Sequence, residues 1–451
     1  MNSTEQAPTS SYRAIVVGAG IAGLAAAFRL KQAGYQVTVY EAGQRIGGRM
    51  STERRDGHVM DLAATATSTK YREMIALAHA AGIGDKIVGS SDMVGIPLRG
   101  EVQRIRSGTL TDLLTTKLLP ISAKLMAAPL LIDARRVAKK SKWYDLGAAG
   151  DVDVETAAEW VARRGHPEID AAVFNALMRG AYLASSTTMS VLDLHFLING
   201  FFGVDLFTFA GGLGTLPEAL AAHVDTRLGA KVTQVLAAGS GVRVSVIEGD
   251  AAERTESADV CVIAVPAPLM TEIYPQLPAE HRAIAANADY VPLMTVKLLT
   301  DGRPEEKAMF LALPERESRE LGALFLEHVK YADRSPEGKG QVGCFWDGRW
   351  NANEWETDDD VIVDKSIGAA EEYLPGLENM VEGSQVIRWR HGVLNSRPGS
   401  YRDLHMLAVA EDSADRVFLA GDYFGGPSVN AALCSGEKAA QRIVSKHRSG
   451  S

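Results

Sequence analysis

Three glycines and one acid near the N-terminus have the types and spacing of a dinucleotide-binding site. Gly18, Gly20 and Gly23 follow the apolar run 14–17, and Glu41 ends a second β-branched run, about 20 residues after the turn. Gly18 permits a tight turn, Gly20 lets a pyrophosphate approach the backbone, and Gly23 lets the next helix pack against the strand. The helix N-terminus suits the phosphates, and Glu41 suits a ribose hydroxyl. The order of strand, turn, helix, strand and acid favours dinucleotide binding over a similar unit that binds nothing.

A second glycine loop lies a few residues after Glu41. Gly47 and Gly48 stand between Arg45 and Arg49. Either arginine can offer forked donors to phosphate oxygens, and the alternative is an ordinary loop with solvated arginines.

A third glycine-rich segment lies near the C-terminus. A short strand over 417–420 leads into Gly421 and Asp422, and a helix of small residues begins at about residue 430. Asp422 suits a ribityl or ribose hydroxyl, and the helix N-terminus suits the electron-rich edge of an isoalloxazine. Elements for phosphate and sugar at both ends of the chain indicate one long cofactor in a discontinuous domain.

In these motifs the chain resembles the superfamily of flavin-containing amine oxidases and protoporphyrinogen oxidases. The resemblance rests on GAGIAG with Glu41, QRIGGR, FAGGLGTLPEAL (209–220), ADVCVIAVPA (258–267) and FLAGDYFGGPSV with SGEKAA. It implies an FAD-dependent oxidoreductase. The FAD is expected to be noncovalent, because Ser400 stands where some members attach FAD through a cysteine. The implied cofactor contacts are Gly18, Gly20, Ala22, Gly23, Glu41, Arg45, Gly48, Arg49, Val232 (through its backbone), Gly421, Asp422, Ser428 and Val429.

The same resemblance implies three residues at the reactive face of the flavin. Amine oxidases hold a lysine by water to flavin N5, and Lys297 lies in a similar predicted strand over 292–300. The alternative is a lysine whose stem packs while its head reaches solvent. Amine oxidases also hold the amine between two aromatic rings. Tyr401 matches the first ring, but Ser428 stands at the second, so the cage is incomplete unless Tyr423 swings in.

Two further features bear on the substrate side. His391 and Arg397 lie close to the expected site in sequence, and either could meet a carbonyl or carboxylate of a substrate. An ordinary loop histidine and a surface salt bridge are the alternatives. Alanines also follow Asp61 where the family usually has a glycine, which predicts a differently shaped loop against the flavin.

Composition limits the partners. The net charge of −9 over 451 residues argues against nucleic acid, and three cysteines without ligand spacing argue against disulfides and metal. A reducing, cytoplasmic location is expected. No apolar window is long enough to span a bilayer, and the nearest, 118–132, is followed by basic residues. A solvated helix face is favoured there over peripheral membrane contact. The sequence does not decide between a monomer and a homodimer.

The expected fold class is α/β plus α+β. A discontinuous, Rossmann-like FAD-binding domain is expected from 1–90, 207–285 and 396–451. A substrate-binding domain with a mixed sheet and helices is expected from 91–206 and 286–395. Expected helices include 71–81 and 364–373, and expected strands include 231–236, 242–248, 259–265, 323–329 and 340–346.

The leading functional prediction is a two-electron oxidation or desaturation, CH–CH or ring CH–NH, of a small to medium cyclic substrate with oxygen as the acceptor. An amine oxidase that releases peroxide is the alternative. A mutase-like, non-redox flavoenzyme and a flavin-bearing protein without turnover also stay open. A nicotinamide dehydrogenase is disfavoured by the C-terminal Gly-Asp motif.

Overall fold

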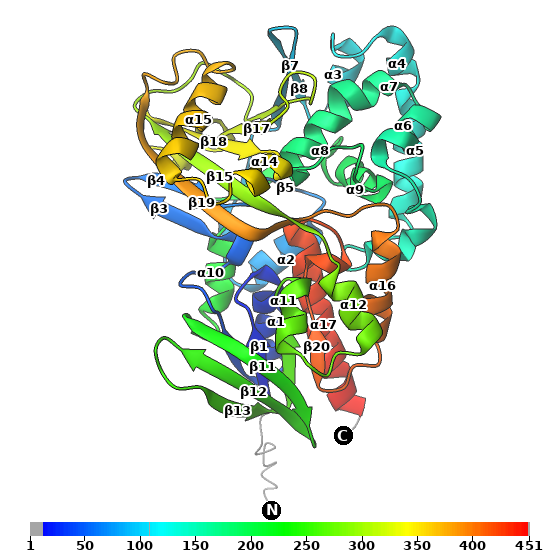
Figure 1. The fold of residues 1–451 in the computed structure, drawn as a ribbon, viewed down its shortest axis with the longest axis vertical. Coiled ribbons are helices and arrows are strands. Elements are labelled where there is room, and N and C mark those ends of the chain that lie inside the picture. The colour runs from blue at the N-terminus through cyan, green and yellow to red at the C-terminus, as the bar shows by residue number, and fades with distance from the viewer. Residues whose placement is uncertain (1–11, 108, 450–451) are drawn as a thin grey trace, which may run out of the picture.

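The computed structural model describes residues 12–107 and 109–449, and a five-stranded parallel sheet organises its lower half (Figure 1). The strand order is β10-β2-β1-β14-β20, which unites segments that lie far apart in sequence. The strands are β1 (Arg13–Val17), β2 (Gln36–Tyr40), β10 (Asp225–Arg227), β14 (Val260–Ile263) and β20 (Val417–Leu419).

The parallel sheet is buried on both faces, as the continuous apolar runs of its strands predict. Ala14 and Val16 pack with α1 (Ile21–Gln32) and α17 (Val429–Ser449), which lie against each other. Ile15 and Val17 pack in a second core with the antiparallel sheet β11 (Ala230–Ala238), β12 (Gly241–Glu248) and β13 (Arg254–Ala258). The same region holds α11 (Ala267–Ile273), α12 (Ala279–Ala286) and α16 (Ser400–Ala410).

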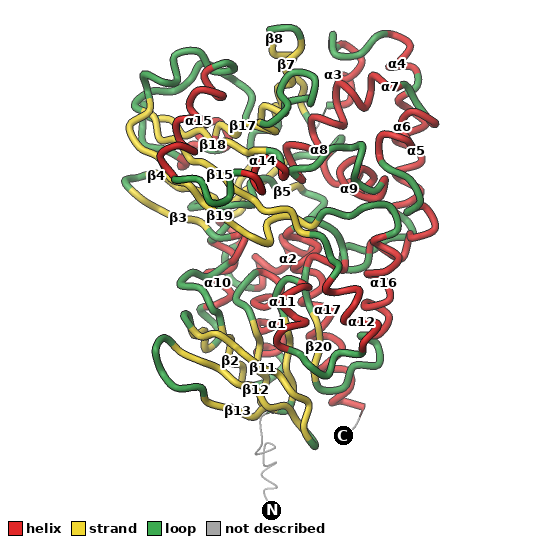
Figure 2. Tube along the Cα trace, in the orientation of Figure 1, coloured by secondary structure: helices red, strands yellow, loops and turns green. Residues whose placement is uncertain are grey.

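A seven-stranded mixed sheet forms one side of the upper half (Figures 1 and 2). Its order is β19-β15-β18-β17-β16-β7-β8, and every neighbouring pair is antiparallel except β16 with β7. The strands are β7 (Met93–Leu98), β8 (Glu101–Arg106), β15 (Tyr290–Thr300), β16 (Phe310–Ala312), β17 (Leu321–Leu326), β18 (Gly340–Trp346) and β19 (Val381–Leu394).

A helical lobe forms the other side of the upper half (Figure 2). It consists of α3 (Leu110–Thr115), α4 (Ile121–Leu125), α5 (Ala127–Ala138), η3 (Leu146–Val152), α6 (Ala157–Arg164), α7 (Pro167–Ile169), η4 (Asp170–Phe174), α8 (Asn175–Tyr182) and α9 (Val191–Phe201). In α5 the buried side chains Leu130, Ala134 and Val137 recur at helical spacing, so one face packs inward and the basic face points outward.

Smaller elements join these sheets and helices or pack against them. They are β3 (Thr52–Arg55), β4 (His58–Asp61), β5 (Thr67–Ser68), β6 (Ile87–Gly89), β9 (Leu206–Phe209), α2 (Arg72–Ala80), α10 (Thr215–Ala221), α13 (Glu327–Lys330), α14 (Gly348–Asn353), α15 (Asp359–Glu371), η1 (Gly48–Met50), η2 (Gly84–Lys86), η5 (Ala332–Arg334) and η6 (Asp422–Phe424).

The predicted fold class is confirmed, and most predicted elements form within a few residues of their expected bounds. The strand expected over 323–329 is shorter, because β17 ends at Leu326 and the chain turns into α13. Helix α16 was not predicted. The parallel sheet and the seven-stranded sheet each draw on separated segments, as expected, but the domain boundaries themselves stay a prediction.

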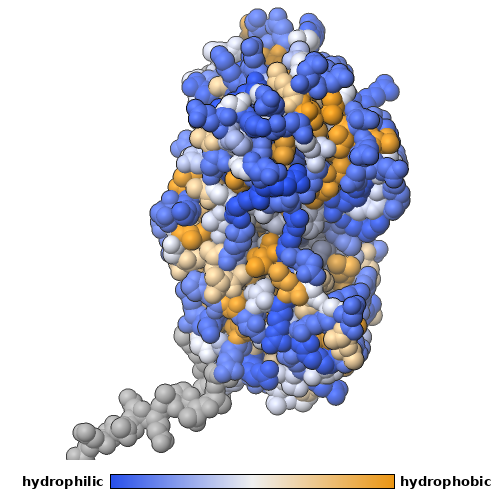
Figure 3. Space-filling model, turned by 90° about the vertical axis from the view of Figure 1, so that its left-hand side faces the viewer, coloured by the Kyte–Doolittle hydropathy of each residue, from blue (hydrophilic) through white to orange (hydrophobic). Residues whose placement is uncertain are grey.

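One face of the molecular surface is drawn by hydropathy in Figure 3. The face shown in Figure 3 is mostly hydrophilic, with apolar side chains in scattered patches. Within residues 12–107 and 109–449, none of the helices combines the length and apolar character that a membrane crossing requires.

Candidate active site

A cavity of about 630 Å³ lies where the parallel sheet faces the seven-stranded sheet, and residues of both halves line it. The C-terminal ends of β1 and β2 lie at this cavity, and the predicted glycine turn and Glu41 follow them. Most of the predicted cofactor contacts line this one cavity: Gly18, Gly20, Ala22, Glu41, Gly48, Arg49, Val232, Gly421, Asp422, Ser428 and Val429.

The turn after β1 requires glycine at two positions. Gly18 has a φ of 101°, and a Cβ there would lie 2.7 Å from the carbonyl oxygen of Ala264. A Cβ on Gly23 would lie 2.0 Å from the carbonyl oxygen of Gly18. Gly23 is not among the lining residues, so its part is the close packing of α1 on the turn rather than contact with a ligand.

The carboxylate of Glu41 is held at the end of β2. It accepts hydrogen bonds from the backbone N–H groups of Ala19 and Gly43, each at 2.8 Å. These two bonds fix the side chain while each oxygen keeps capacity for another donor, such as a ribose hydroxyl. The arrangement fits the role that the sequence predicted.

Arg49 and Asp422 join the two ends of the chain across the cavity. A guanidinium nitrogen of Arg49 donates to Asp422 at 2.6 Å and to the carbonyl of Gly392 at 3.1 Å. The Tyr290 hydroxyl donates to the other oxygen of Asp422 at 2.7 Å. Arg45, in contrast, lies 2.6 Å from Glu53 and does not line the cavity. Of the two arginines, only Arg49 is therefore placed to meet a ligand there.

His391 lines the cavity beside this pair. Its ring lies edge-on to Tyr290, with centroids 5.9 Å apart. Burial and the nearby charge of Arg49 lower the pKa of His391, so the imidazole is neutral at pH 7. Arg397 is exposed, lies 3.6 Å from Asp289 and is not among the lining residues, in keeping with a surface salt bridge.

The upper end of the cavity is apolar. The Phe310 and Phe325 rings stack at 4.5 Å, and Phe345 meets Phe325 edge-on at 4.9 Å. The apolar lining there also includes Val94, Ile105, Leu177, Leu183, Leu293, Met309 and Trp389. Three arginines of the seven-stranded sheet line the cavity as well, Arg106 on β8 and Arg388 and Arg390 on β19. The carboxylates among the described lining residues, Glu41, Glu272 and Asp422, belong to the parallel-sheet half.

The two tyrosines predicted for the aromatic cage lie outside the cavity lining. Tyr401 is fully buried on α16, where its hydroxyl donates to Asp193 at 2.5 Å. Tyr423 is also fully buried, and its hydroxyl donates to the carbonyl of Ala420 at 3.2 Å. Ser428 does line the cavity. The positions of Tyr401 and Tyr423 therefore do not support a cage around an amine.

Lys297 also lies outside the cavity lining, in a buried ionic cluster. Its ammonium is 3.1 Å from Glu327, and both side chains are fully buried. Lys330 bridges Glu327 at 3.5 Å and Asp61 at 2.7 Å, and Arg334 lies 3.7 Å from Asp61. Although burial favours the neutral carboxyls, these cations keep the pKa values of Asp61 and Glu327 below their ordinary values. This position does not support the predicted link to flavin N5.

The ionic cluster nevertheless adjoins the cavity wall. Asp61 ends β4, and Ala63 and Ala64 after it line the cavity. The hydroxyl of Thr295 donates to the carbonyl of Leu62 at 3.1 Å, which ties this loop to β15. The alanine-containing loop thus takes its shape from a buried charge network that sequence reasoning did not identify.

The apolar end of the cavity was not predicted from the sequence. Phe310, Phe325 and Phe345 lie on three different strands, and strand pairing alone brings them together. Phe310 pairs with Phe325, and Phe325 pairs with Gly343, two residues before Phe345. An apolar residue in a β-strand is by itself a sign of a core position, so no local signal could have identified these three.

The residues present fit an FAD. The glycine turns approach closely, since a Cβ on Gly48 would lie 3.4 Å from the Cα of Gly20. The N-terminus of α1 and the side chains of Glu41, Arg49 and Asp422 supply donors and acceptors for phosphates and hydroxyls. None of the described lining residues is a cysteine, and Ser400 begins α16 outside this lining, in keeping with noncovalent binding.

Comparisons with known proteins agree with this geometry. Residues 21–444 match the family described as flavin containing amine oxidoreductase. AofH of Mycobacterium tuberculosis, which carries the name flavin-containing monoamine oxidase, is 27% identical over 285 residues. That match covers 60% of this chain and only 61% of AofH. Protoporphyrinogen oxidase 2 of Arabidopsis thaliana is 23% identical, with 97% of this chain and 94% of the relative covered. The structure of cyclohexylamine oxidase from Brevibacterium oxydans has a TM-score of 0.74 at 19% identity, with 97% of this chain and all of the other covered.

Proposed function

The chain belongs to the family of flavin-containing amine oxidoreductases, with FAD as its cofactor, and from this premise we propose that it dehydrogenates an uncharged cyclic substrate. The proposed reaction removes two electrons from a CH–CH or ring CH–NH bond. The observation that carries the proposal is the apolar end of the cavity, built from Phe310, Phe325 and Phe345. Such a surface favours an uncharged ring over a cation.

Bound FAD supplies the two-electron acceptor for a hydride equivalent, so the protein has to bind, orient and shield the reacting carbon. The stacked Phe310 and Phe325 offer a face against which a ring can lie. The apolar lining excludes water from the reacting end. Arg49 and Asp422 hold the Gly392 backbone and the Tyr290 side chain in place around the cavity.

A neutral base is available for the proton that leaves the substrate. His391 lines the cavity with a lowered pKa, so it is unprotonated at pH 7 and can accept a proton from a C–H or N–H group. In the proposed reaction the hydride equivalent leaves one substrate atom, the proton leaves the neighbouring one, and a double bond forms between the two. His391→Phe would then slow the oxidation but leave binding of the ring largely unchanged.

Molecular oxygen is the proposed final acceptor. Two electrons and two protons per turnover would convert one oxygen molecule to one hydrogen peroxide. An oxygen electrode and a peroxide assay, run together with identification of the product, test both parts. One peroxide and one new ring double bond per substrate is the expected result. Release of ammonia from the substrate would reject desaturation in favour of deamination.

Amine oxidation is the second candidate, because AofH matches over 60% of this chain and carries the name monoamine oxidase. An unprotonated amine would fit an apolar cavity. The positions of Tyr401 and Tyr423 outside the lining and the serine at 428 count against this candidate. A shared panel of cyclic ketones and of the same rings with an exocyclic amino group separates the two functions.

A further inference from the structure

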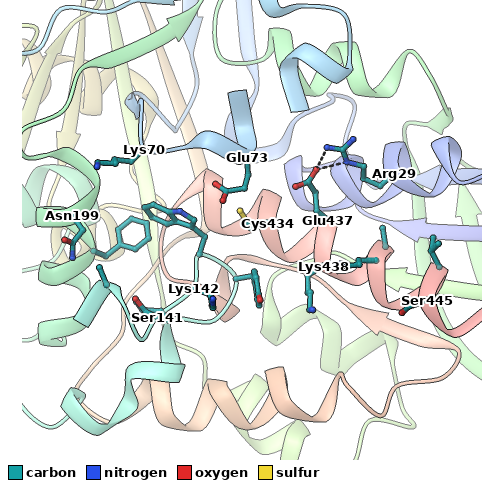
Figure 4. A pocket seen from close by; sticks show the side chains of 18 of the residues that line it. Arg29, Lys70, Glu73, Ser141, Lys142, Asn199, Cys434, Glu437, Lys438 and Ser445 are labelled. Carbon is teal, nitrogen blue, oxygen red and sulfur yellow. Dashed lines mark hydrogen bonds and ion pairs between the residues drawn. The ribbon is translucent and has the colours of Figure 1, made fainter. Parts of the chain in front are cut away.

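A second and larger hollow opens on the outside of the molecule, away from the glycine turns. This outer cleft, about 1220 Å³, lies between α1 and α17 on one side and α5, α9 and residues 141–146 on the other (Figure 4). Its volume is ample for a small molecule, since ligand pockets range from about 300 to 1,000 Å³. The predicted cofactor residues do not line it.

The outer cleft carries an excess of positive charge. Lys70, Lys142 and Lys438 line it, and none of them forms an ion pair within residues 12–107 and 109–449. Arg29 and Glu437 neutralise each other at 2.6 Å, as the dashed lines in Figure 4 mark. Glu73 is the remaining carboxylate of the lining. Three ammonium groups without an ion pair among the described residues therefore share the lining with one carboxylate that is not neutralised, Glu73, which accepts a hydrogen bond from Asn430 at 3.4 Å. This excess of positive charge favours an anionic ligand.

The floor of the cleft is aromatic. Trp143 and Tyr144 are partly exposed there, and Phe196 meets Trp143 edge-on at 4.8 Å. The Lys438 ammonium lies 5.5 Å from the centre of the Tyr144 ring. Ring faces beside ammonium groups suit a ligand that is both planar and acidic.

One buried polar side chain in the lining has no partner. His195 is 3% exposed, and neither of its ring nitrogens has a hydrogen-bond partner among the residues that the structure describes. Its ring packs edge-on against Trp160, with centroids 4.5 Å apart. Burial lowers the pKa of His195 to about 4, so the neutral ring has one N–H to donate. A buried donor without a partner costs free energy, and a ligand oxygen in the cleft would satisfy it.

We propose that the outer cleft is a second ligand site, distinct from the flavin cavity, and that it binds an aromatic carboxylate. The ring would lie against Trp143 and Tyr144, and the carboxylate would meet Lys142, Lys438 and the His195 N–H. Phe196 lines both the cleft and the flavin cavity, so a ligand in the cleft is separated from the substrate by one side chain. The proposal does not depend on which substrate the flavin oxidises.

The test uses the FAD-loaded full chain and the fluorescent acid 1-pyrenebutyrate, with 1-pyrenebutanol as its uncharged match. Fluorescence anisotropy measures the affinity of each, and the difference in tryptophan-to-pyrene energy transfer between the wild type and W143F reports the place of binding. We expect the acid to bind at least tenfold more tightly than the alcohol. K142Q/K438Q should weaken acid binding about tenfold, equal to about 1.4 kcal/mol, because each charge is only partly shielded from water.

Matched controls separate the site from general charge effects. K117Q/K307Q removes two exposed lysines that do not line the cleft, and we expect it to bind the acid like the wild type. H195F keeps an aromatic ring against Trp160 but loses the N–H, and it should weaken acid binding several-fold. W143F should lower the energy transfer while most of the affinity stays, and Trp160, beside His195, would still act as a donor.

Several results would overturn the proposal. Equal binding of acid and alcohol would mean that the lysines do not select an anion. An unchanged affinity in K142Q/K438Q, or competition between the acid and a compound that reduces the flavin, would place the probe elsewhere. Loss of acid binding at high protein concentration, together with a dimer in sedimentation, would mean that the cleft receives a second copy of the chain.

Discussion

Replacing Lys297 by Met tests whether this lysine stabilises the protein or serves the flavin. The structure puts Lys297 and Glu327 3.1 Å apart with both side chains fully buried. Removing one partner of a buried ion pair costs about 3–5 kcal/mol, because the other charge stays desolvated. In K297M, Glu327 keeps Lys330 at 3.5 Å, so we expect a loss near the lower end, about 3 kcal/mol.

The variant E327Q, which removes the partner of Lys297, should lose more unfolding free energy than K297M. In E327Q both Lys297 and Lys330 lose Glu327, and Asp61 remains for Lys330 and Arg334, so we expect a loss near the upper end, about 5 kcal/mol. The double variant removes the pair together. Its loss should be smaller than the sum of the single losses by about 0.5–3 kcal/mol, the usual range for side chains in contact.

Two assays on the same preparations decide whether Lys297 stabilises the protein or serves the flavin. Urea unfolding of the FAD-loaded protein measures the free energy of unfolding, and stopped-flow mixing of the reduced protein with oxygen measures the reoxidation rate. We expect K297M to lose stability while its reoxidation rate stays close to that of the wild type. Unchanged stability with reoxidation slowed more than about tenfold, a barrier change of about 1.4 kcal/mol, would refute the structural role.

Three further predictions concern the cofactor site and pH. G23A should lose most of its bound FAD, measured as the ratio of flavin to protein absorbance, because the new Cβ would lie 2.0 Å from the Gly18 carbonyl oxygen. D422N should retain FAD less well on dialysis than the wild type, because Arg49 loses its 2.6 Å partner; equal retention would contradict this. Burial raises the pKa of Glu411 from 4.5 to about 8. The folded chain therefore holds a proton that the unfolded chain releases, and stability should fall as pH rises between these values, by up to about 1.4 kcal/mol per unit. E411Q should remove that fall. If urea unfolding gave E411Q and the wild type the same dependence of stability on pH, the role of Glu411 would be refuted.

The cofactor site could be predicted because its determinants are local. The glycines at 18, 20 and 23 fix a turn between a strand and a helix whatever the rest of the chain does. Glu41 is likewise held by backbone groups of the same unit. The choice between Arg45 and Arg49 could not be made in this way. Arg45 is held away from the cavity by Glu53, whereas Arg49 is held beside the cavity by Asp422, 373 residues away in sequence.

The reactive side could not be predicted, because spacing says nothing about distant partners. Tyr401 has the position of a cage tyrosine in sequence, but Gly399, with a φ of 93°, leads directly into α16. That helix directs the Tyr401 hydroxyl to Asp193, 208 residues away. Lys297 shares its strand face with Leu293, which does line the cavity, but its ammonium is taken by Glu327.

Anaerobic reduction of the bound flavin by a matched pair of substrates distinguishes desaturation from amine oxidation. A cyclic ketone and the amine that carries an exocyclic amino group in place of its carbonyl present the same ring, and bleaching of the oxidised flavin band reports reduction by either one. The apolar end formed by Phe310, Phe325 and Phe345 predicts bleaching by the ketone, with little or none by the protonated amine. Bleaching by the amine alone would reject the proposed desaturation and make this chain an amine oxidase.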